Sequence, residues 1–242
     1  IANSVISDIL DCATCFRGSN MALERPKSLR ELALEYLRNR IVDGTFQMGQ
    51  VLSERKISEE LGVSKSPVRE ALAQLRDEGL VDIEPQKGAR VFTLSEEEVI
   101  QICDFRQAIE SASFELALQR DPARLAKNMD RVVQKMVAKK AVDDEDAYIA
   151  LDNEFHHLVF EHAGNDYLTA SYTRYVGKIA ALRKLLSQLP KHTDLSFDEH
   201  KCLGEAVRKG DLTEIKALLA EHIDRTRKAY KKAKGLLQKS DH

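Results

Sequence analysis

The segment "LSERKISEELGVSKSPVREALAQLRDEGLV" (residues 52–81) constrains the fold of this chain more than any other. Ser53 is placed to cap a short helix, because its hydroxyl can accept a hydrogen bond from the unpaired N–H groups of a first turn. Gly62 can end that helix in the left-handed conformation. A second helix then begins after Ser64 or after Ser66. The proline that follows suits Ser66 as the cap, but the pattern leaves both starts open.

One side of the predicted second helix is apolar and its front end is polar. The apolar positions recur at helical spacing: Val68, Ala71, Leu72 and Leu75. Lys65, Ser66 and Arg69 lie off that stripe, near the N-terminal end. An amphipathic helix that packs by one side and presents hydroxyls and cations at its front suits a DNA major groove. A solvated helix in an ordinary helical hairpin fits this stretch equally well.

The residues around these two helices complete a small domain. Ser28 and Glu31 form a capping box, and the helix that they start is ended by an Asp-Gly pair at 43–44. After the second helix come two short alternating runs, with Gly88 available for the turn between them. Three helices followed by a two-stranded hairpin make a winged helix-turn-helix. We assign it to residues 21–93.

From Ser95 onward the chain changes character. Proline and glycine become rare, strand patterns disappear, and amphipathic helical patterns follow one another. We place six helices near 95–119, 122–140, 144–163, 166–188, 196–209 and 212–236. Their short loops favour an antiparallel bundle over residues 95–240. The predicted fold is therefore mainly α, with an N-terminal winged helix-turn-helix and a C-terminal all-α bundle.

Net charge and hydropathy limit how this chain can contact nucleic acid or a membrane. The formal net charge is -2 at pH 7 and the pI is about 6.4, so any contact with nucleic acid must come from a local basic surface. No apolar run approaches the roughly 18 residues that a membrane-spanning helix needs. We therefore expect a soluble protein without membrane partners, with the cytoplasm as its default compartment.

Residues 1–20 stand apart from the functional interpretation. The segment begins without Met and lacks the basic flank and cleavage site of a signal peptide, and Met21 looks like the natural start. We interpret residues 1–20 as a leader that is non-native or disordered. Cys12 and Cys15 form a C-x-x-C pair, but no second pair follows to complete a zinc site. The other two cysteines are isolated, so we expect no disulfide framework.

Four ionisable side chains fall on helix faces that are otherwise apolar. Asp152 and His156 lie on adjacent turns of one predicted helix, and His200 and His222 interrupt the apolar faces of the last two. A buried carboxylate is costly unless it is paired or binds a metal. Three imidazoles and one carboxylate suit a divalent transition metal, zinc first, with nickel or manganese as alternatives. Each histidine alone would be interpreted as a satisfied core residue; the four together favour a metal.

The remaining histidines, His157, His162 and His192, are predicted to lie at the surface. Glu154 and His157 spell Glu-x-x-His, a part of the ferritin-like di-iron site. That site needs a second such motif and two further glutamates, and the sequence offers no second motif. The di-iron interpretation is therefore rejected.

Arg106 also lies on a predicted core face. A guanidinium that points inward needs an anion, and its planar fork matches a carboxylate. Glu110, one turn further along the helix, could pair with it instead. Both partners stay open at this point: an acid brought by a ligand, or Glu110.

Together with the "PQKGARV" that follows it, the opening segment resembles the DNA-binding domain of the GntR family of bacterial transcription regulators, over roughly residues 28–93. The helical half resembles the FCD ligand-binding domain of that family's FadR subfamily over about 95–236, through "DNEFHHLVFEHAGN", "DEH" and "AEHI". It also matches the family's metal pattern Asp-x-x-x-His…His…His. The resemblance implies a homodimer that binds a palindromic operator and releases it when a small carboxylate binds.

Carried over by position, the family's DNA contacts fall on Arg55, Ser64, Lys65, Ser66, Arg69 and Gly88. Many relatives carry arginine where Lys65 stands. Because lysine lacks the bidentate fork that reads guanine, we expect Lys65 to contact phosphate. In similar proteins an arginine at the place of Arg106 helps to hold the effector acid.

The predicted function is that of a DNA-binding transcription regulator, a repressor and not an enzyme. Its expected partners are double-stranded operator DNA, a second copy of the chain and a small carboxylate. One alternative is a helical metallo-hydrolase, but no general base is evident and the N-terminal domain would be unexplained. A second alternative is a direct metal sensor, in which the ion itself is the signal.

Overall fold

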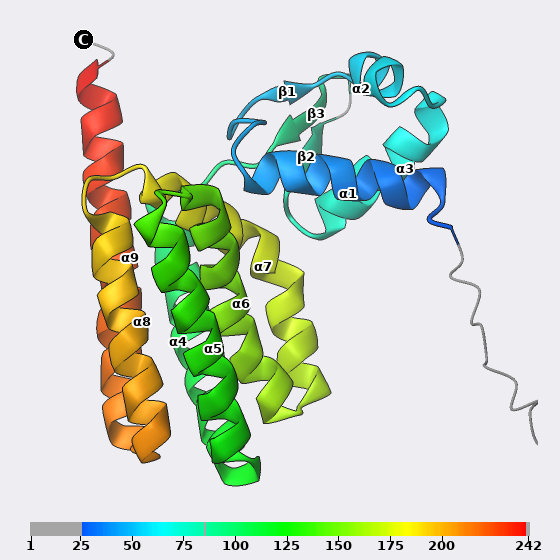
Figure 1. Cartoon of the computed structure of the whole chain (residues 1–242). Coiled ribbons are helices and arrows are strands. Elements are labelled where there is room, and N and C mark those ends of the chain that lie inside the picture. Colours follow the sequence, from blue (N-terminus) through cyan, green and yellow to red (C-terminus); the bar gives the residue numbers. More distant parts are fainter. Residues whose placement is uncertain (1–25, 85, 241–242) are drawn as a thin grey trace, which may run out of the picture.

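The computed structural model describes residues 26–84 and 86–240, with side chains as far as residue 234. Within that part of the chain, a small N-terminal domain lies at one end of a longer bundle of helices (Figure 1). The predicted leader with its two cysteines lies outside the described residues. No helix among the described residues is long and apolar enough to cross a membrane.

The N-terminal domain has the predicted order of elements, with one strand more. Its elements are α1 (Leu29–Val42), β1 (Val51–Leu52), α2 (Glu54–Leu61), α3 (Lys65–Asp77), β2 (Val81–Glu84) and β3 (Gly88–Val91). The strands form one antiparallel sheet in the order β1-β3-β2. The predicted two-stranded hairpin was therefore incomplete. β1 has only two residues, which is too short to show an alternating pattern.

The caps of these helices follow the predicted chemistry. Ser28 and Glu31 form the capping box of α1, and the Ser53 hydroxyl accepts a hydrogen bond from the N–H of Lys56. Gly62 ends α2 with a φ of 65°. Ser64 is the cap of α3, which settles the boundary that the sequence left open, although its side chain makes no capping hydrogen bond.

The C-terminal part is the predicted bundle. Its helices are α4 (Glu96–Arg120), α5 (Pro122–Ala141), α6 (Glu145–Ala163), α7 (Asp166–Ser187), α8 (His192–Lys209) and α9 (Leu212–Ser240). Two ends differ from the prediction. α8 begins at His192 instead of 196, because the break at Pro190 is closed at once by Lys191 in a left-handed conformation with a φ of 61°. α9 runs four residues beyond the predicted end at 236.

The arrangement of the bundle brings four helices around one interior. α4 packs against both α6 and α9, and α8 packs against α9. The side chains between them are mostly apolar and buried: Val99, Phe114, Phe155, Leu203, Leu219 and Ile223 are each at most 1% exposed. Any polar group on these inner faces is therefore removed from water.

Two bundle helices hold the N-terminal domain in place. On α7, Gly177 lies so close to Leu80 that a Cβ added to the glycine would be 2.7 Å from Leu80 Cδ1. On α9, the Tyr230 hydroxyl donates a hydrogen bond of 2.5 Å to the carbonyl of Leu94, in the link between the wing and α4. Both helices thus connect the interior of the bundle to the N-terminal domain.

Candidate functional site

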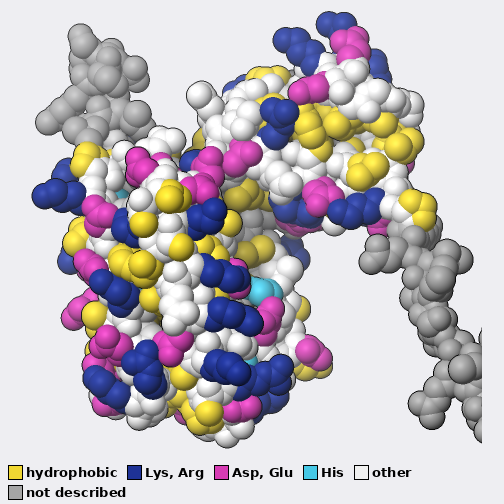
Figure 2. Space-filling view, in the orientation of Figure 1, with side chains coloured by type: hydrophobic (Ala, Val, Ile, Leu, Met, Phe, Trp, Pro, Cys, Tyr) yellow, Lys and Arg dark blue, Asp and Glu magenta, His cyan; other side chains and the backbone are white. Residues whose placement is uncertain are grey.

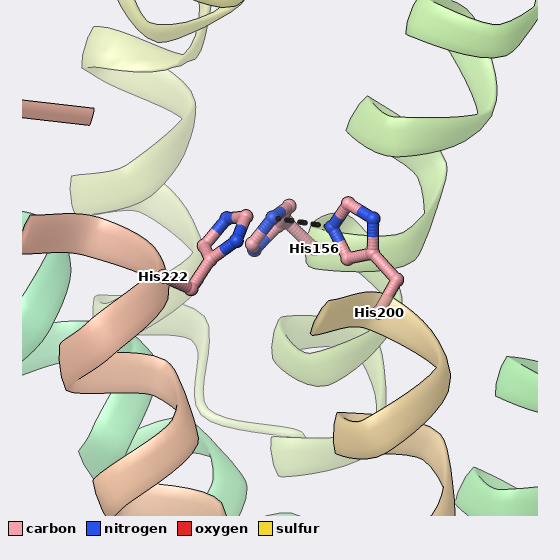
Figure 3. Close-up of side chains that lie close together, drawn as sticks. All are labelled: His156, His200 and His222. Atoms are coloured by element: carbon pink, nitrogen blue, oxygen red, sulfur yellow. Dashed lines mark hydrogen bonds between the residues drawn. The ribbon is translucent and has the colours of Figure 1, made fainter. Parts of the chain in front are cut away.

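Three imidazole rings meet in the interior of the bundle. His156 comes from α6, His200 from α8 and His222 from α9, and their side chains point toward one another (Figure 3). One nitrogen of each ring lies within 4.8 Å of the others. All three residues are at most 3% exposed. The sequence prediction that these three residues converge is confirmed.

Carboxylates behind two of the rings fix their orientation. The Nδ1 of His156 lies 2.8 Å from Glu110 Oε2, and the Nδ1 of His222 lies 2.7 Å from Glu199 Oε2. An ionised carboxylate only accepts hydrogen bonds, so each Nδ1 carries the proton. The Nε2 atom of each ring therefore keeps its lone pair and is a candidate metal ligand, in the arrangement common to metal-binding histidines.

The spacing of the ring nitrogens fits a shared metal ion. His156 Nε2 and His200 Nε2 are 3.3 Å apart. Two imidazole nitrogens bound to one tetrahedral Zn²⁺ at about 2.0–2.1 Å are separated by about 3.3–3.4 Å. His200 Nδ1 is buried and has no hydrogen-bond partner among the described residues. The two Nε2 atoms form a hydrogen bond, and with the proton of His200 on Nδ1 both lone pairs could bind one cation between the rings.

Burial keeps the three rings neutral, as metal ligands must be. Desolvation lowers the pKa of His200 to about 3. Desolvation is also the largest cause that lowers the pKa of His156, followed by the charge of Arg183, and it lowers the pKa of His222. At neutral pH all three imidazoles are therefore unprotonated and free to donate electron pairs.

Asp152, the fourth predicted ligand, lies beside this cluster. Its Oδ1 is 3.8 Å from His156 Nε2 and its Oδ2 is 3.9 Å from His200 Nε2. Arg183 Nε lies 3.0 Å from Oδ1, and the Ser196 hydroxyl donates to Oδ2 at 3.3 Å. Burial raises the pKa of Asp152, but the attraction of His200 and Arg183 outweighs it and the pKa is lowered. The carboxylate is thus ionised and faces the same space as the imidazoles.

A small cavity opens next to Asp152 and His222. Its volume is about 20 Å³, and its lining includes the polar residues Arg106, Arg183, His192, Thr193, Ser196 and Arg225. That space holds about one water molecule. Any larger molecule would require these side chains to move apart.

Arg106 has one partner and one free nitrogen. Its Nε donates to Glu110 Oε1 at 2.7 Å, so the pairing with Glu110 that the sequence left open is present. Its Nη2 is buried and has no hydrogen-bond partner among the described residues, and the whole residue is only 1% exposed. Because Glu110 also holds His156, one carboxylate connects the arginine of the cavity to the imidazole cluster. Arg106 can therefore keep Glu110 and still bind an anion.

Several residues of the site escaped the sequence analysis. Glu199 accepts from Arg225 through two hydrogen bonds of 2.6 Å while it holds His222. Arg183 lies on a face of α7 that we did not single out. Glu110 was noticed only as a partner for Arg106. Interrupted apolar faces were the available signal for the buried Arg183 and Glu110, whereas nothing in the sequence predicts that Glu199 contacts His222.

The histidines outside the cluster behave differently from one another. Among the described residues, His157 and His162 take no part in the metal cluster, as expected; His157 is partly exposed beside Glu161 and His162 bonds Asn128. The prediction that His192 lies at the surface was wrong. It lines the cavity and its ring contacts Arg225, because α8 starts earlier than predicted.

The predicted DNA contacts lie together on the N-terminal domain. Ser64, Lys65, Ser66 and Arg69 are exposed at the front of α3, with Arg55 exposed on α2 and Gly88 exposed at the start of β3. Lys and Arg side chains project from the edge of this domain that is far from the bundle (Figure 2). Arg69 pairs with Glu54 at 2.6 Å and Arg55 pairs with Glu59 at 2.8 Å. Such exposed pairs are weak and can be exchanged for phosphate.

Comparison with known protein families agrees with this geometry. Residues 29–91 match the family described as bacterial regulatory proteins, gntR family, and residues 101–225 match the FCD domain. The first match covers the winged helix-turn-helix, and the second covers the helices that carry the imidazole cluster.

Two transcriptional repressors and one solved structure are similar to this chain, over half of its length or more. The gluconate operon transcriptional repressor of Bacillus subtilis is 34% identical over 132 residues, which are 54% of each chain. The HTH-type transcriptional repressor NanR of Cronobacter sakazakii is 28% identical over 82% of this chain and 84% of its own. A crystal structure of a putative GntR regulator from Rhodococcus sp. RHA1 has a TM-score of 0.74 at 22% identity, covering 83% of this chain and 96% of its own, and so shares the fold.

Proposed function

Because the chain belongs to the gntR family of bacterial regulatory proteins and carries an FCD domain, we propose that it is a cytoplasmic transcriptional repressor controlled by a small carboxylic acid. It binds a two-fold operator as a homodimer. A single recognition helix reads only a few base pairs, so a second copy is needed for useful specificity. The relatives that are named as repressors support this direction of control.

On DNA, the front of α3 enters the major groove. Arg69 is placed to read a base edge, and Lys65 is placed to contact phosphate, since an ammonium group cannot form the two parallel bonds that an arginine makes to guanine. Arg55 and the hairpin at Gly88 contact the backbone beside it. The exposed partners Glu54 and Glu59 are released when DNA binds.

In the bundle, His156, His200, His222 and Asp152 hold one divalent transition-metal ion, with zinc expected before nickel or manganese. The observation that supports this most strongly is the set of three buried, neutral imidazoles, of which His156 and His222 donate through Nδ1 and so keep the lone pair of Nε2. Four protein ligands leave room at a metal of higher coordination number for an acid. When bound, the ion supplies a Lewis acid that attracts a carboxylate.

The acid binds in the cavity beside the cluster. There the Nη2 of Arg106, which has no partner among the described residues, donates a hydrogen bond to its carboxylate. Arg106 lies on α4, and α4 begins at the residue after Ser95, directly behind the wing. The helix α9 carries both His222 and Tyr230, which holds the linker carbonyl of Leu94. Opening the cavity therefore shifts helices that touch the DNA-binding domain, and the population of the DNA-competent form falls.

Titration of the acid in the presence and absence of operator DNA tests this coupling. A coupling of about 1–3 kcal/mol is typical and changes operator affinity by roughly 5- to 150-fold. By thermodynamic linkage, bound operator DNA must lower the affinity of the protein for the acid by the same factor. Arg106→Ala should keep metal and operator binding and lose the response to the acid. Equal acid affinities with and without operator would show that the two domains are not coupled.

Two other functions give different results in the same assays. A direct metal sensor would change its operator affinity on removal of the metal with no acid present. A metallo-hydrolase would require a general base near the ion; the carboxylates that hold the cluster, Glu110 and Glu199, are already occupied by His156 and His222. The family assignment also favours a regulator over a hydrolase.

A further inference from the structure

Three buried side chains near the cavity each have a donor that makes no well-formed hydrogen bond to any residue that the structure describes. The donors are Arg106 Nη2, Arg183 Nη2 and the hydroxyl of Tyr172. The three residues are 1%, 7% and 0% exposed. A buried donor without an acceptor is costly, so most buried polar groups in proteins are paired. Three unpaired donors in one region indicate an acceptor that a ligand provides.

These donors belong to one polar region. Burial raises the pKa of Tyr172. The other groups that act on its hydroxyl are first the charge of Arg183, then the charges of Glu110 and Arg106, and last a weak hydrogen bond with Arg183, so Tyr172 and Arg183 lie side by side. The Tyr172 ring is fixed by stacking on Phe160, with the ring centroids 4.1 Å apart. Arg106 and Arg183 both line the cavity.

Each guanidinium is already oriented through its other nitrogens. Arg183 Nε lies 3.0 Å from Asp152 Oδ1, and its Nη1 donates to Asn153 Oδ1 at 2.7 Å. Arg106 is held by Glu110. The two Nη2 groups therefore belong to side chains whose positions are already fixed, one on α4 and one on α7. A preorganised donor loses little entropy when it binds an anion.

The charges around the cavity suggest how many anionic groups a ligand carries. Three arginines line the cavity, Arg106, Arg183 and Arg225. Three buried or half-buried carboxylates pair with them: Glu110, Asp152 and Glu199. Because the imidazoles are neutral, the three positive charges of these arginines equal the three negative charges of these carboxylates. A divalent ion adds two positive charges in a place where uncompensated charge is costly, and two carboxylates would neutralise them.

We propose that Arg183, together with Tyr172, is a second anion-binding arm and that the effector is a dicarboxylic acid. One carboxylate is held by Arg106 on the side of the imidazole cluster, and Arg183 takes the other. The inference rests on the proposed control by a carboxylic acid and adds the specificity for a second acidic group. Arg183 is thus a specificity-determining residue.

Malate and lactate form a matched pair of probes, because they share the α-hydroxy acid end and only malate has a second carboxylate. We would measure the affinity of the zinc-loaded 242-residue chain for both acids by calorimetry. The parent should bind malate at least about 10-fold more tightly than lactate, as expected for one additional charge-assisted interaction. Arg183→Gln should remove that preference, so that the zinc-loaded variant binds malate and lactate with about the same affinity.

The remaining variants separate this role from a structural one. Arg183→Lys keeps the charge but not the fork, and should retain part of the malate preference. Tyr172→Phe should reduce the ratio of malate affinity to lactate affinity, whereas Arg106→Gln should weaken the binding of both acids. Zinc content and melting temperature confirm that each variant is folded.

Two results would overturn the inference in distinguishable ways. An unchanged malate-to-lactate ratio in Arg183→Gln, or a parent that binds lactate as tightly as malate, would refute the second arm and leave the control by a carboxylic acid intact. Failure of both acids to bind zinc-loaded protein would count against the carboxylate effector and the second arm together.

Discussion

The ion pairs of the two candidate sites differ mainly in their exposure to water. In the DNA-binding domain, the side chains of Arg69 and Glu54 are 65% and 36% exposed. In the bundle, those of Arg106 and Glu110 are both 1% exposed. Exposed pairs contribute little and exchange partners readily, whereas a buried pair loses much when one partner is removed. We therefore expect the first surface to exchange its ion-pair partners for phosphate readily, and the second to bind only a ligand that brings matching charges.

The largest effect should come from removing a buried imidazole. We expect His200→Ala to weaken zinc binding by more than about 100-fold, because even outer-shell partners of a metal ligand contribute about 10- to 100-fold. The melting temperature of the zinc-loaded protein should fall with it, since a bound ligand stabilises the folded state. Elemental analysis and thermal unfolding measure both.

His157→Ala is the matched control for that variant, since His157 lies on α6 next to His156 but outside the cluster. It should keep close to one zinc ion per chain. Equal zinc content in His200→Ala and His157→Ala, after reconstitution with zinc, nickel and manganese in turn, would exclude the metal site.

The next effect concerns the exposed surface. Arg69→Ala should weaken operator binding by about 1–3 kcal/mol, the usual contribution of a good contact to a base edge. Arg208→Ala is the control, because Arg208 also forms an exposed pair, with Asp130, but lies in the bundle. If both variants bind operator as the parent does in a mobility-shift titration, α3 is not the recognition helix.

Replacing a carboxylate that holds one of the imidazoles should lower zinc affinity less than removing an imidazole does. Glu110→Gln keeps the size of the side chain but weakens the acceptor for His156 and Arg106. We expect a loss of about 10- to 100-fold in zinc affinity. Competition with a chelator measures it. A zinc affinity equal to that of the parent would show that the carboxylate has no part in orienting the ring.

The smallest effect should be a change in salt dependence. Lys65→Ala should weaken operator and unrelated DNA alike and reduce the slope of log affinity against log salt by about one. Titrations at four or more salt concentrations give the slope. A loss confined to the operator would mean that Lys65 reads a base after all.

The same contrast in exposure explains what the sequence could predict. His156, His200 and His222 were found because a polar residue on an apolar helix face is conspicuous, and the helix boundaries followed from caps such as Ser28 and Ser95. The partners of these groups were not found. Glu199 lies on a half-buried face and meets His222 only because α8 packs on α9. Such contacts depend on how helices dock, which local spacing does not determine.

The close approach of Gly177 to Leu80 also has a consequence for sequence variation among relatives. Any larger residue at 177 requires either that the side chain of Leu80, which is 1% exposed, shifts or that α7 moves away from it. A smaller residue at 80 would restore the fit. In chains that keep this contact, the residues at 177 and 80 should therefore co-vary, with compensating changes of side-chain volume. In chains where these two residues vary independently, the contact between the two domains should be lost.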